Sequence, residues 1–590
     1  MTALGGYFAL FDADDGGAIV LSEFRRVISF ADGGDLALVF AALEAASAQG
    51  EWIALAADYE LGACFEPAVI PSAAPSLCGW VFGQARHLDA QGVIAFLECC
   101  LDGLAEHERV AGVAEVKVML SAADHGSSVE QIRRWIADGD CYQINLTFPI
   151  DCRVYGHSLA LYSRLRERQP VRYGAYLVTP EKTVLSFSPE LFFERRGSHV
   201  LTRPMKGTAQ RGATPAEDEA KRAALLVSEK ERAENIMIVD LLRNDLGRLA
   251  APGKVRVDSL CVAEAYPTLW QMVSSVSADL PGASLSELFR ALFPCGSITG
   301  APKIRAMQRI SELEFAPRGL YTGALGWLAP GGDCRFNVAI RTLDVQPDGR
   351  ARLGVGSGIV IDAVAELEYA ECLLKSEFLT GCDPGFELIE TLRLEGGDYP
   401  LLTLHLERLQ ASAHALCFSC DLPAISAALA EHASARAIGT YRVRLTLTHE
   451  GHYHVSLTPL TDETGPWWVV LADEQLDAND YLLRHKTSAR SRYQRALAAL
   501  AEHPELFDSI FFNTRGEVCE GARSNVFVEH DGVLLTPPLA CGLLPGVMRR
   551  QLLESGRAVE AVLTRDDLLG ASAIYMANAL RGLIPVSLRV

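Results

Sequence analysis

The sequence lacks an excess of basic residues. Its 590 residues include 54 Lys and Arg against 74 Asp and Glu, which gives a formal net charge of −20 at pH 7. Because binding to a nucleic-acid backbone requires cations in excess, this balance argues against nucleic acid as the main partner. Small anionic ligands are compatible with it if they meet local basic groups.

Long apolar runs and an export signal are also missing. No stretch of about 18 consecutive apolar residues occurs, so we expect no membrane-spanning helix. The opening segment MTALGGYFALFDADDGG does not join a basic stretch to an apolar run, and we expect no secretory signal. The 15 cysteines are scattered and odd in number, which predicts reduced thiols and a cytoplasmic location.

The chain is too long for one domain of roughly 100–200 residues. Residues 381–386, GCDPGF, hold two glycines, a proline and an aspartate, and indicate a break in the chain. We therefore expect a first domain over residues 1–380, a linker over 381–386 and a second domain over 387–590. Hydrophobic residues make up 49% of the chain, so each domain can form a core.

The spacing of apolar residues predicts mixed helices and strands. We expect helices over 37–47, 127–139 (with a serine cap) and 363–378, and a helix-rich stretch over 215–248. The predicted strands of the first region cover residues 52–61, 141–150, 173–179, 184–188, 191–194, 325–328, 335–343 and 352–360. Residues 386–394 then open a new α/β pattern.

Residues 11–24, FDADDGGAIVLSEF, imitate part of a calcium-binding loop. Loop positions one, three, six, eight and twelve are occupied by Asp12, Asp14, Gly17, Ile19 and Glu23. Position five is Gly16, which has no side-chain oxygen, and the preceding residues are a poor helix. We therefore favour a hairpin turn, and keep a calcium-regulated binding protein as the alternative from another functional class.

Two other motifs give weak signals. Cys417 and Cys420 form a single CxxC without a second pair, which favours a core pair on a helix over a zinc or redox site. The stretch GVGSGIV, residues 354–360, lacks the third glycine of a dinucleotide-binding loop.

Two pairs of glutamates repeat one spacing in separate predicted helices. Glu231 and Glu234 are three residues apart, and so are Glu368 and Glu371. The members of each pair share a helix face, and four such carboxylates could bind one hard divalent cation. Spacing alone also allows two solvated acidic faces.

The glutamates occur within an ordered set of motifs. RPMKGT (203–208), expected in a loop, and CGSITGAPK (295–303) precede FNVAIRTL (336–343), GVGSGIV and EYAEC. In this order they resemble the chorismate-binding family, which includes anthranilate synthase large subunits, aminodeoxychorismate synthases and isochorismate or salicylate synthases. The resemblance covers about residues 5–380 and implies an α+β domain with an antiparallel sheet sandwich flanked by helices.

The resemblance also implies roles for these motifs. The four glutamates would surround Mg²⁺, which would bind the ring carboxylate of chorismate. Arg341, predicted on a strand, would hold the enolpyruvyl carboxylate. Further substrate contacts are expected from Thr299, Tyr321, Gly356, Ser357 and Gly358.

The residue type at the position of Lys206 distinguishes members of this family from one another. Anthranilate synthases have alanine at the matching position, whereas aminodeoxychorismate synthases resemble this chain. A deprotonated lysine could add at ring C2 as the 4-hydroxyl leaves, after which ammonia attacks C4 and expels the lysine. By the resemblance, Gln271 occupies the place of a histidine found in many family members. Because an amide is no general acid, the proton for the leaving hydroxyl must come from elsewhere, and Lys206 or water are the candidates.

A glutamine amidotransferase is missing from the sequence. No Gly-x-Cys-x-Gly nucleophile elbow with later His and Glu partners is found. The resemblance therefore implies that ammonia comes from solution or from a separate glutaminase subunit.

The second region carries another ordered set: FELIETLRL, LLTLHLERL, YRVRLTL, LLRHKTSARSRYQRAL, FFNTRGEVCEGARSNVFV, LACGLLPGVMRRQLL and YMANALRGLIPV. These motifs resemble fold-type IV pyridoxal-phosphate enzymes, which include branched-chain and D-amino-acid aminotransferases and aminodeoxychorismate lyases. The resemblance implies two α/β subdomains, pyridoxal 5′-phosphate as cofactor and a homodimer through this region.

Lys486, in RHKTSAR, is the only lysine after the proposed boundary, which favours it as the lysine that holds the cofactor. By the resemblance, Glu520 would pair with the pyridine nitrogen, and Thr391 would lie near Lys486. The expected phosphate contacts are Arg408, Val547, Met548, Asn578 and Ala579.

Together the resemblances predict a multifunctional transferase and lyase of folate biosynthesis. The first domain would aminate chorismate at C4, and the second would remove the C4 proton through Lys486 and eliminate pyruvate to leave 4-aminobenzoate. The alternative is an anthranilate synthase-like domain fused to a branched-chain or D-amino-acid aminotransferase-like domain. The fusion favours the first interpretation, because its first half makes the amine that a lyase consumes.

Overall fold

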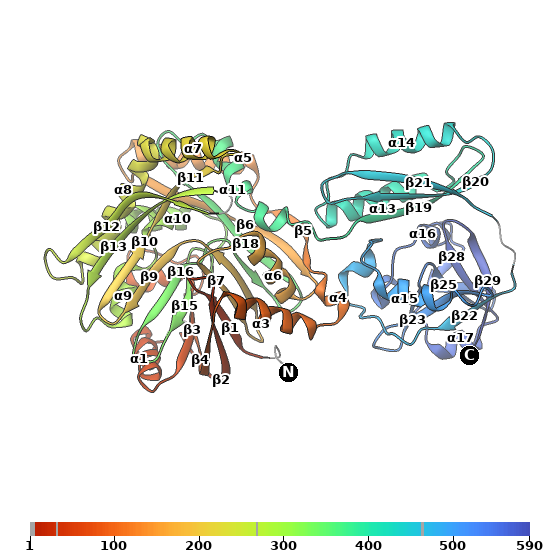
Figure 1. Cartoon of the computed structure of the whole chain (residues 1–590), viewed down its shortest axis with the longest axis horizontal. Coiled ribbons are helices and arrows are strands. Elements are labelled where there is room, and N and C mark those ends of the chain that lie inside the picture. Colours follow the sequence, from red (N-terminus) through yellow and green to blue (C-terminus); the bar gives the residue numbers. More distant parts are fainter. Residues whose placement is uncertain (1–5, 31–33, 267–268, 462–464, 590) are drawn as a thin grey trace. The chain divides into compact units, whose positions relative to one another are not determined.

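The computed structural model describes residues 6–30, 34–266, 269–461 and 465–589 (Figure 1). The chain divides into two compact units. Unit 1 comprises Met1–Leu104, Val116–Val154 and Ser158–Cys382, and unit 2 comprises Ala105–Glu115, Tyr155–His157 and Asp383–Val590. Two short segments of the first region therefore belong to unit 2, which nothing in the sequence predicts.

Unit 1 is built on antiparallel strands. Within the described ranges, strands β1 to β18 form one hydrogen-bonded network of 18 strands. The longest pairs join β2 (Ala18–Phe30) to β4 (Leu77–Leu88), β6 (Gln143–Tyr155) to β18 (Arg350–Ile359), and β12 (Val255–Ala265) to β13 (Leu269–Asp279). Its largest apolar cluster includes Phe192 and Phe289, and a second includes Phe82 and Leu177.

The shorter strands of unit 1 are β1 (Phe8–Asp12), β3 (Trp52–Ala57), β7 (Tyr173–Val178), β8 (Thr183–Ser188), β9 (Leu191–Arg196), β10 (His199–Arg203), β11 (Met205–Gln210), β14 (Gly300–Ala301), β15 (Ala324–Leu328), β16 (Cys334–Val338) and β17 (Thr342–Val345). Strand β5 (Gly112–Val118) begins in a segment of unit 2 and ends in unit 1. The helices of this part of the chain are α1 (Leu36–Ala48), α2 (Gly62–Phe65), α3 (Ala90–Asp102), α4 (Glu106–Arg109), α5 (Ala122–Ala137), α6 (Ser158–Arg168), α7 (Pro215–Val227), α8 (Glu229–Gly247), α9 (Leu285–Leu292), α10 (Lys303–Leu313), α11 (Ala365–Leu374) and α12 (Glu377–Thr380).

The two glutamate-bearing helices lie over the strands that carry the other predicted residues. Helix α8 begins at Ser228, whose hydroxyl caps its first turn, and it packs on β11, β12 and β13. Helix α11 packs against α5 and β18. Figure 1 shows α5, α7, α8 and α11 together along the upper side of unit 1.

Three predicted elements of unit 1 need correction. Helix α5 begins at Ala122, and Ser121 caps it. Ser127 and Ser128, where the helix was expected to begin, lie inside it and donate their hydroxyl groups to backbone carbonyls one turn earlier. The predicted strand over 52–61 ends at Ala57, before a 3₁₀ turn over Tyr59–Leu61. The predicted helix over 363–378 is divided into α11 and α12.

Two corrections concern predicted site residues. Lys206 lies on strand β11, paired with β13, and not in a loop. Arg341 lies between β16 and β17, and not on one continuous strand. Its φ is +49°, a left-handed conformation that is uncommon for a residue with a side chain and that interrupts the strand.

The hairpin prediction for residues 11–24 is confirmed. Strands β1 and β2 pair directly, and Ala13 N–H donates to Gly17 O at 2.9 Å. The Asp12 carboxylate is buried and accepts hydrogen bonds from Tyr162 Oη at 3.0 Å and Arg166 Nε at 2.8 Å. The helical prediction for the CxxC is wrong, because Cys417 and Cys420 follow the end of α13 (Leu402–Ala415) in a turn.

Unit 2 contains two sheets. Strands β19 (Leu388–Glu395), β20 (Thr440–Leu447) and β21 (Tyr453–Pro459) form an antiparallel sheet that α13 and α14 (Leu422–Ser434) pack against. An eight-stranded mixed sheet follows, in the order β24 (Val518–Gly521), β23 (Leu506–Phe512), β22 (Trp467–Leu471), β29 (Gly582–Leu588), β28 (Ala573–Asn578), β25 (Asn525–His530), β26 (Val533–Thr536) and β27 (Ala558–Glu560). Helices α15 (Ser491–Ala499), α16 (Val547–Glu554) and α17 (Arg565–Gly570) accompany it.

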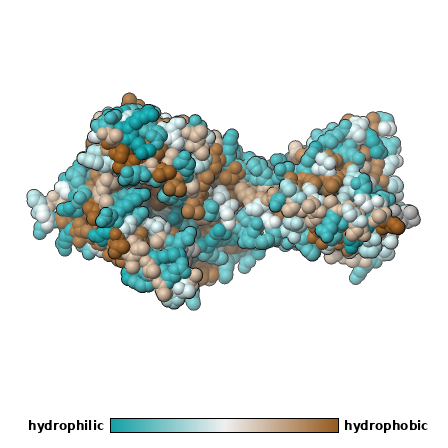
Figure 2. Space-filling view, turned by 90° about the horizontal axis from the view of Figure 1, so that it is seen from above, coloured by the Kyte–Doolittle hydropathy of each residue, from teal (hydrophilic) through white to brown (hydrophobic). Residues whose placement is uncertain are grey.

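No described helix is long and apolar enough to cross a membrane. On the face shown in Figure 2, apolar residues form small groups between hydrophilic ones.

Candidate active sites

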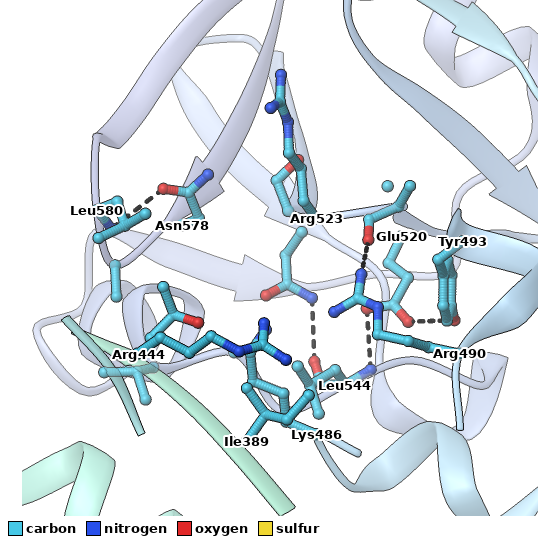
Figure 3. Close-up of a pocket in the computed structure, with 18 of the residues that line it drawn as sticks. Ile389, Arg444, Lys486, Arg490, Tyr493, Glu520, Arg523, Leu544, Asn578 and Leu580 are labelled. Atoms are coloured by element: carbon cyan, nitrogen blue, oxygen red, sulfur yellow. Dashed lines mark hydrogen bonds between the residues drawn. The ribbon is translucent and has the colours of Figure 1, made fainter. Parts of the chain in front are cut away.

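Unit 2 contains a cavity of about 650 Å³. It is lined by β19, α13, the segment before α15, the turn between β24 and β25, the start of α16 and the turn after β28. Figure 3 shows Glu520 and Tyr493 on one side, Asn578 and Leu580 on the other, and Arg444 and Lys486 between them. The volume suits a small molecule or cofactor.

Lys486 is positioned by strand β19. Ile389 N–H donates to Lys486 O at 2.8 Å, and Ser488 N–H donates to Glu387 O at 2.8 Å, so the lysine segment lies along this strand. Burial, with help from Arg490 and Arg408, lowers the pKa of Lys486 to about 7. The amine can therefore be neutral, and nucleophilic, near neutral pH.

Glu520 lies on strand β24, in the other sheet of unit 2. Its Oε1 accepts a hydrogen bond from Tyr493 Oη at 2.7 Å, and its Oε2 accepts one from Leu544 N–H at 3.1 Å (Figure 3). Burial raises the pKa of Glu520 to about 7, against the effect of these two hydrogen bonds. A cationic group placed against this carboxylate would favour its ionised form.

The far end of the cavity is suited to an anion. Helix α16 begins after Gly546, and no side chain caps it, so the N–H groups of Val547 and Met548 lie in an uncapped first turn. The Asn578 side chain shapes the facing turn, since its Oδ1 accepts from the N–H groups of Leu580 at 3.1 Å and Arg581 at 3.0 Å.

Every residue predicted for the second site lines this one cavity. They come from six separate stretches of sequence: Thr391, Arg408, Lys486, Glu520, Val547 with Met548, and Asn578 with Ala579. The structure therefore brings the set together, and the role of each stays a prediction.

Sequence reasoning missed a group of arginines on the same wall. Arg442 and Arg444 lie on β20, and Arg581 follows β28; all three line the cavity. Burial lowers the pKa of Arg442, and the neighbouring charges of Arg444 and Arg581 lower it further. Converging cations are typical of an anion-binding site. The available signal was the alternate spacing in YRVR, which places both arginines on one strand face.

In unit 1, Lys206 lies among carboxylates. It is within electrostatic reach of Glu190, Glu234 and Glu371. Gly207 has a φ of +79°, and a side chain there would collide with the Glu231 carboxylate, so that carboxylate lies against the strand next to Lys206. Burial raises the pKa of Glu234, against the effect of Lys206.

Glu190, which sequence reasoning missed, is the most deeply buried of these acids. It follows β8 and is 4% exposed, and its Oε1 has no hydrogen-bond partner among the described residues. Burial raises the pKa of Glu190 to about 7, although Ser297 and Lys206 oppose this shift. The signal was a carboxylate in the apolar stretch FSPELFF.

Gln143 is a second group that was missed. It is fully buried on β6, and neither polar atom of its amide is hydrogen-bonded to a described residue. A side chain at Gly358 would collide with this amide and would approach Lys206 Nζ, so Gln143, Gly358 and Lys206 lie together. Buried polar groups without partners are rare, and here they suit a polar substrate.

The remaining predicted residues of unit 1 are divided between places. Arg341 and Gln271 line a small cavity with Met205 and Tyr266, whereas Tyr321 lines a separate cavity of about 510 Å³. Burial lowers the pKa of Arg341.

Gln271 and Thr299 already have protein partners. The Gln271 amide donates to Gly207 O at 2.9 Å and accepts from Thr208 Oγ1 at 3.0 Å, so it supports the strand that bears Lys206. Thr299 Oγ1 donates to Cys295 O at 3.1 Å. Gly356 is held by Lys375, whose Nζ donates to Gly356 O at 2.9 Å and pairs with Glu371 at 2.7 Å.

The predicted magnesium ligands do not form a compact group in this arrangement. Among the described residues, no three His, Cys, Asp or Glu side chains are placed to hold one metal ion. Burial and the nearby charges of Glu231 and Glu368 all raise the pKa of Glu234, so oxygen donors are present in the right region. The four-glutamate site stays a prediction.

A family model described as chorismate binding enzyme matches residues 82–381, just over half of the chain. The chain belongs to the chorismate-binding enzyme family. A second model, amino-transferase class IV, matches residues 387–588. The family predicted for each region is thereby confirmed, as is the predicted fold class.

Three relatives illustrate the match. An aminodeoxychorismate synthase component 1 from Bacillus subtilis (strain 168) is 44% identical over 250 residues, which cover 42% of this chain and 53% of the relative. A protein named anthranilate synthase component 1 3, from Haloarcula marismortui, is 41% identical over 252 residues, 42% of this chain and 50% of the relative. The chain thus spans about half the length of the curated relatives it matches. The structure of anthranilate synthase component I from Streptococcus pneumoniae TIGR4 has a TM-score of 0.54 at 25% identity and covers 62% of this chain and 92% of that one.

Proposed function

We propose that the chain makes 4-aminobenzoate from chorismate in two steps, one in each unit. Unit 1 aminates chorismate at C4, and unit 2 eliminates pyruvate from the product. The observation that carries the proposal is that each unit places one lysine opposite a buried carboxylate: Lys206 near Glu190, and Lys486 near Glu520. The similarity to an aminodeoxychorismate synthase component 1 supports the first step.

The first step uses Lys206 as a nucleophile. Its Nζ forms a bond to ring C2 while the bond between C4 and the hydroxyl oxygen breaks. Glu190, whose pKa of about 7 allows a protonated form at neutral pH, gives the leaving hydroxyl its proton, so that water departs. Ammonia then bonds to C4, the C2–N bond to Lys206 breaks, and a proton from the incoming nitrogen returns to Glu190. Glu190 thus replaces Lys206 or water as the proposed proton source.

Two groups assist this step. Arg341 and the backbone of residues 356–358 bind the carboxylates of chorismate, and the Gln143 amide offers a buried donor and acceptor beside Lys206. Glu231, Glu234, Glu368 and Glu371 would hold Mg²⁺, which would neutralise the ring carboxylate. No step above depends on the metal.

The unit 2 cavity fits pyridoxal 5′-phosphate, because it joins a buried lysine with a pKa of about 7, an opposed carboxylate and an uncapped helix start. When bound, this cofactor supplies an electron sink for a developing carbanion. Glu520 would hold the ring nitrogen, and Arg408 with the first turn of α16 would hold the phosphate. The residues present therefore suit the group.

The chain's own residues then perform the second step. Lys486, neutral near pH 7, removes the C4 proton as a general base. Arg442, Arg444 and Arg581 bind a substrate that carries two carboxylates. The C–O bond to the enolpyruvyl group breaks, pyruvate leaves and the ring becomes aromatic, which makes the step favourable.

Ammonia for the first step comes from solution or from a separate glutaminase subunit. A homodimer through unit 2 and a cytoplasmic location belong to the same proposal.

The competing function is an anthranilate synthase joined to an amino-acid aminotransferase, and the 41% identity to a protein named anthranilate synthase component 1 3 favours testing it. The full chain is incubated with chorismate, ammonium, Mg²⁺ and pyridoxal 5′-phosphate, and the products are separated by chromatography. We expect 4-aminobenzoate and pyruvate in equal amounts. Anthranilate as the main product would overturn the proposal in favour of the competing function.

A further inference from the structure

Glu390 connects three elements at the anion end of the unit 2 cavity. It is 2% exposed on β19, next to Thr391. Its Oε1 accepts from Arg408 Nε at 2.8 Å, and its Oε2 accepts from Arg408 Nη2 at 2.6 Å and from His405 Nδ1 at 2.7 Å. One buried carboxylate therefore orients two basic side chains of α13, which lie three residues apart on one helix face.

Arg408 also reaches the turn that begins α16. Its Nη1 donates to Pro545 O at 3.3 Å, directly before the Gly546 N-cap. Three of its five N–H groups are used in these bonds, and the residue lines the cavity. The two bonds to Glu390 therefore fix the plane of the Arg408 guanidinium at the cavity.

His405 shares this end of the cavity. Because Arg408 and His405 outweigh the effect of burial and lower the pKa of Glu390 to about 2, the carboxylate is ionised and acts as an acceptor. His405 Nδ1 must then carry the proton, which leaves Nε2 as the other polar atom of the ring.

His405 Nε2 has no partner among the described residues, although the side chain is 2% exposed. The residue lines both the 650 Å³ cavity and a neighbouring cavity of about 410 Å³. The two cavities also share Met548 and Ala579, both predicted phosphate contacts. Nε2 is therefore a buried polar atom without a protein partner, on a side chain that lies beside the predicted phosphate contacts.

We propose that His405 binds the cofactor's phosphate directly through Nε2, and that Glu390 is the positioning residue that sets both His405 and Arg408. This inference rests on the proposed function, since it takes pyridoxal 5′-phosphate as the ligand of unit 2. Nε2 accepts from a protonated phosphate oxygen, or donates to an ionised one when the ring is protonated. In either case Nδ1–H donates to Glu390, which orients the ring.

The test separates the two ring nitrogens. Asparagine keeps a donor near the Nδ1 position and removes the Nε2 group, whereas glutamine keeps a group near Nε2 and removes the contact to Glu390. Full-length apo-protein is titrated with pyridoxal 5′-phosphate and, separately, with pyridoxal, which has no phosphate. The readout is the ratio of the two dissociation constants, followed by absorbance.

We expect His405→Asn to lower the preference for the phosphorylated form about tenfold, the value of one charge-assisted hydrogen bond. His405→Gln should keep a ratio close to that of the unchanged protein. His414→Asn, the same substitution at an exposed position of α13, is the matched control and should change nothing.

An unchanged ratio in His405→Asn, or an equal loss in His405→Gln, would overturn the inference. If His405→Asn does not fold by circular dichroism, His405→Ala, which also lacks the Nε2 group, takes its place: a lowered ratio supports the inference and an unchanged ratio refutes it. Failure of the proposed function is a different result: the unchanged protein would bind neither compound, and borohydride would attach no cofactor to Lys486.

Discussion

The two lysines of the proposed reactions lie in different surroundings. Lys486 is enclosed in a cavity of about 650 Å³, and burial lowers its pKa to about 7. Lys206 lies half-buried on a strand among carboxylates from β8–β9, α8 and α11. In unit 2, desolvation favours the neutral form of the Lys486 amine. In unit 1, the Lys206 amine lies close to several carboxylates instead.

The predicted site residues are also distributed differently in the two units. All the residues predicted for unit 2 line one cavity, while Arg341 and Tyr321, both predicted for unit 1, line two different cavities. Buried polar atoms without partners, such as those of Gln143, occur beside Lys206.

The largest expected effect divides the two activities. Lys486→Ala should reduce lyase activity on supplied aminodeoxychorismate by about 10³-fold, because it removes the general base. It should also abolish the mass increase that borohydride leaves on the protein with the cofactor. Amination of chorismate by the same variant serves as the internal control and should persist. Retained lyase activity would contradict the assignment.

Lys206→Ala is expected to show the reverse pattern. Amination at C4 should fall by about 10³-fold or be diverted to another product, because the covalent step is lost. Lyase activity on supplied substrate should match that of the unchanged protein. The measurement is product analysis by chromatography; an amination rate equal to that of the unchanged protein would remove the covalent step from the mechanism.

Glu190→Gln should have a smaller effect, confined to unit 1. We expect amination to slow by about 10²-fold, since an amide keeps the shape of the side chain and cannot give up a proton. The unchanged protein should lose amination activity as pH rises through about 7, where Glu190 becomes ionised. A variant that kept this pH limb would show that another group is responsible.

The smallest expected effect concerns the pKa of Lys486. Because this pKa is lowered to about 7, the amine gains its neutral form as pH rises, and its rate of reaction with pyridoxal should rise about tenfold per pH unit below 7 and level off above it. Stopped-flow absorbance measures this rate, and pyridoxal avoids the ionisation of a phosphate. A rate that continues to rise to pH 10 would show that Lys486 is not desolvated as described.

Much of unit 2 could be predicted because its signals are local. Lys486 is the only lysine of its region, and the sequence LLPGVM marks the start of α16 through a proline and a glycine. The arginines of β20 were missed because alternate charges on a strand are equally typical of a solvated face. Nothing in that pattern says that Arg581, far along the chain, lies beside them.

Unit 1 was harder because its features depend on distant segments. Lys206 was expected in a loop, since Gly207 and Pro204 flank it, but pairing with β13 makes the segment a strand. Arg341 was expected on a strand because FNVAIRTL is apolar and β-branched, but its backbone turns at a φ of +49°. Tertiary pairing overrides local preference in both cases.

The order of the motifs along the chain, by itself, determined the two families and the antiparallel sheet of unit 1, and it predicts the two lysines. Only the tertiary structure decided that Glu190 and Gln143 accompany Lys206, that Glu390 orients His405 and Arg408, and that Lys486 can be neutral. Desolvation and charge depend on what surrounds a side chain in space, and those neighbours come from segments that are far apart in the sequence.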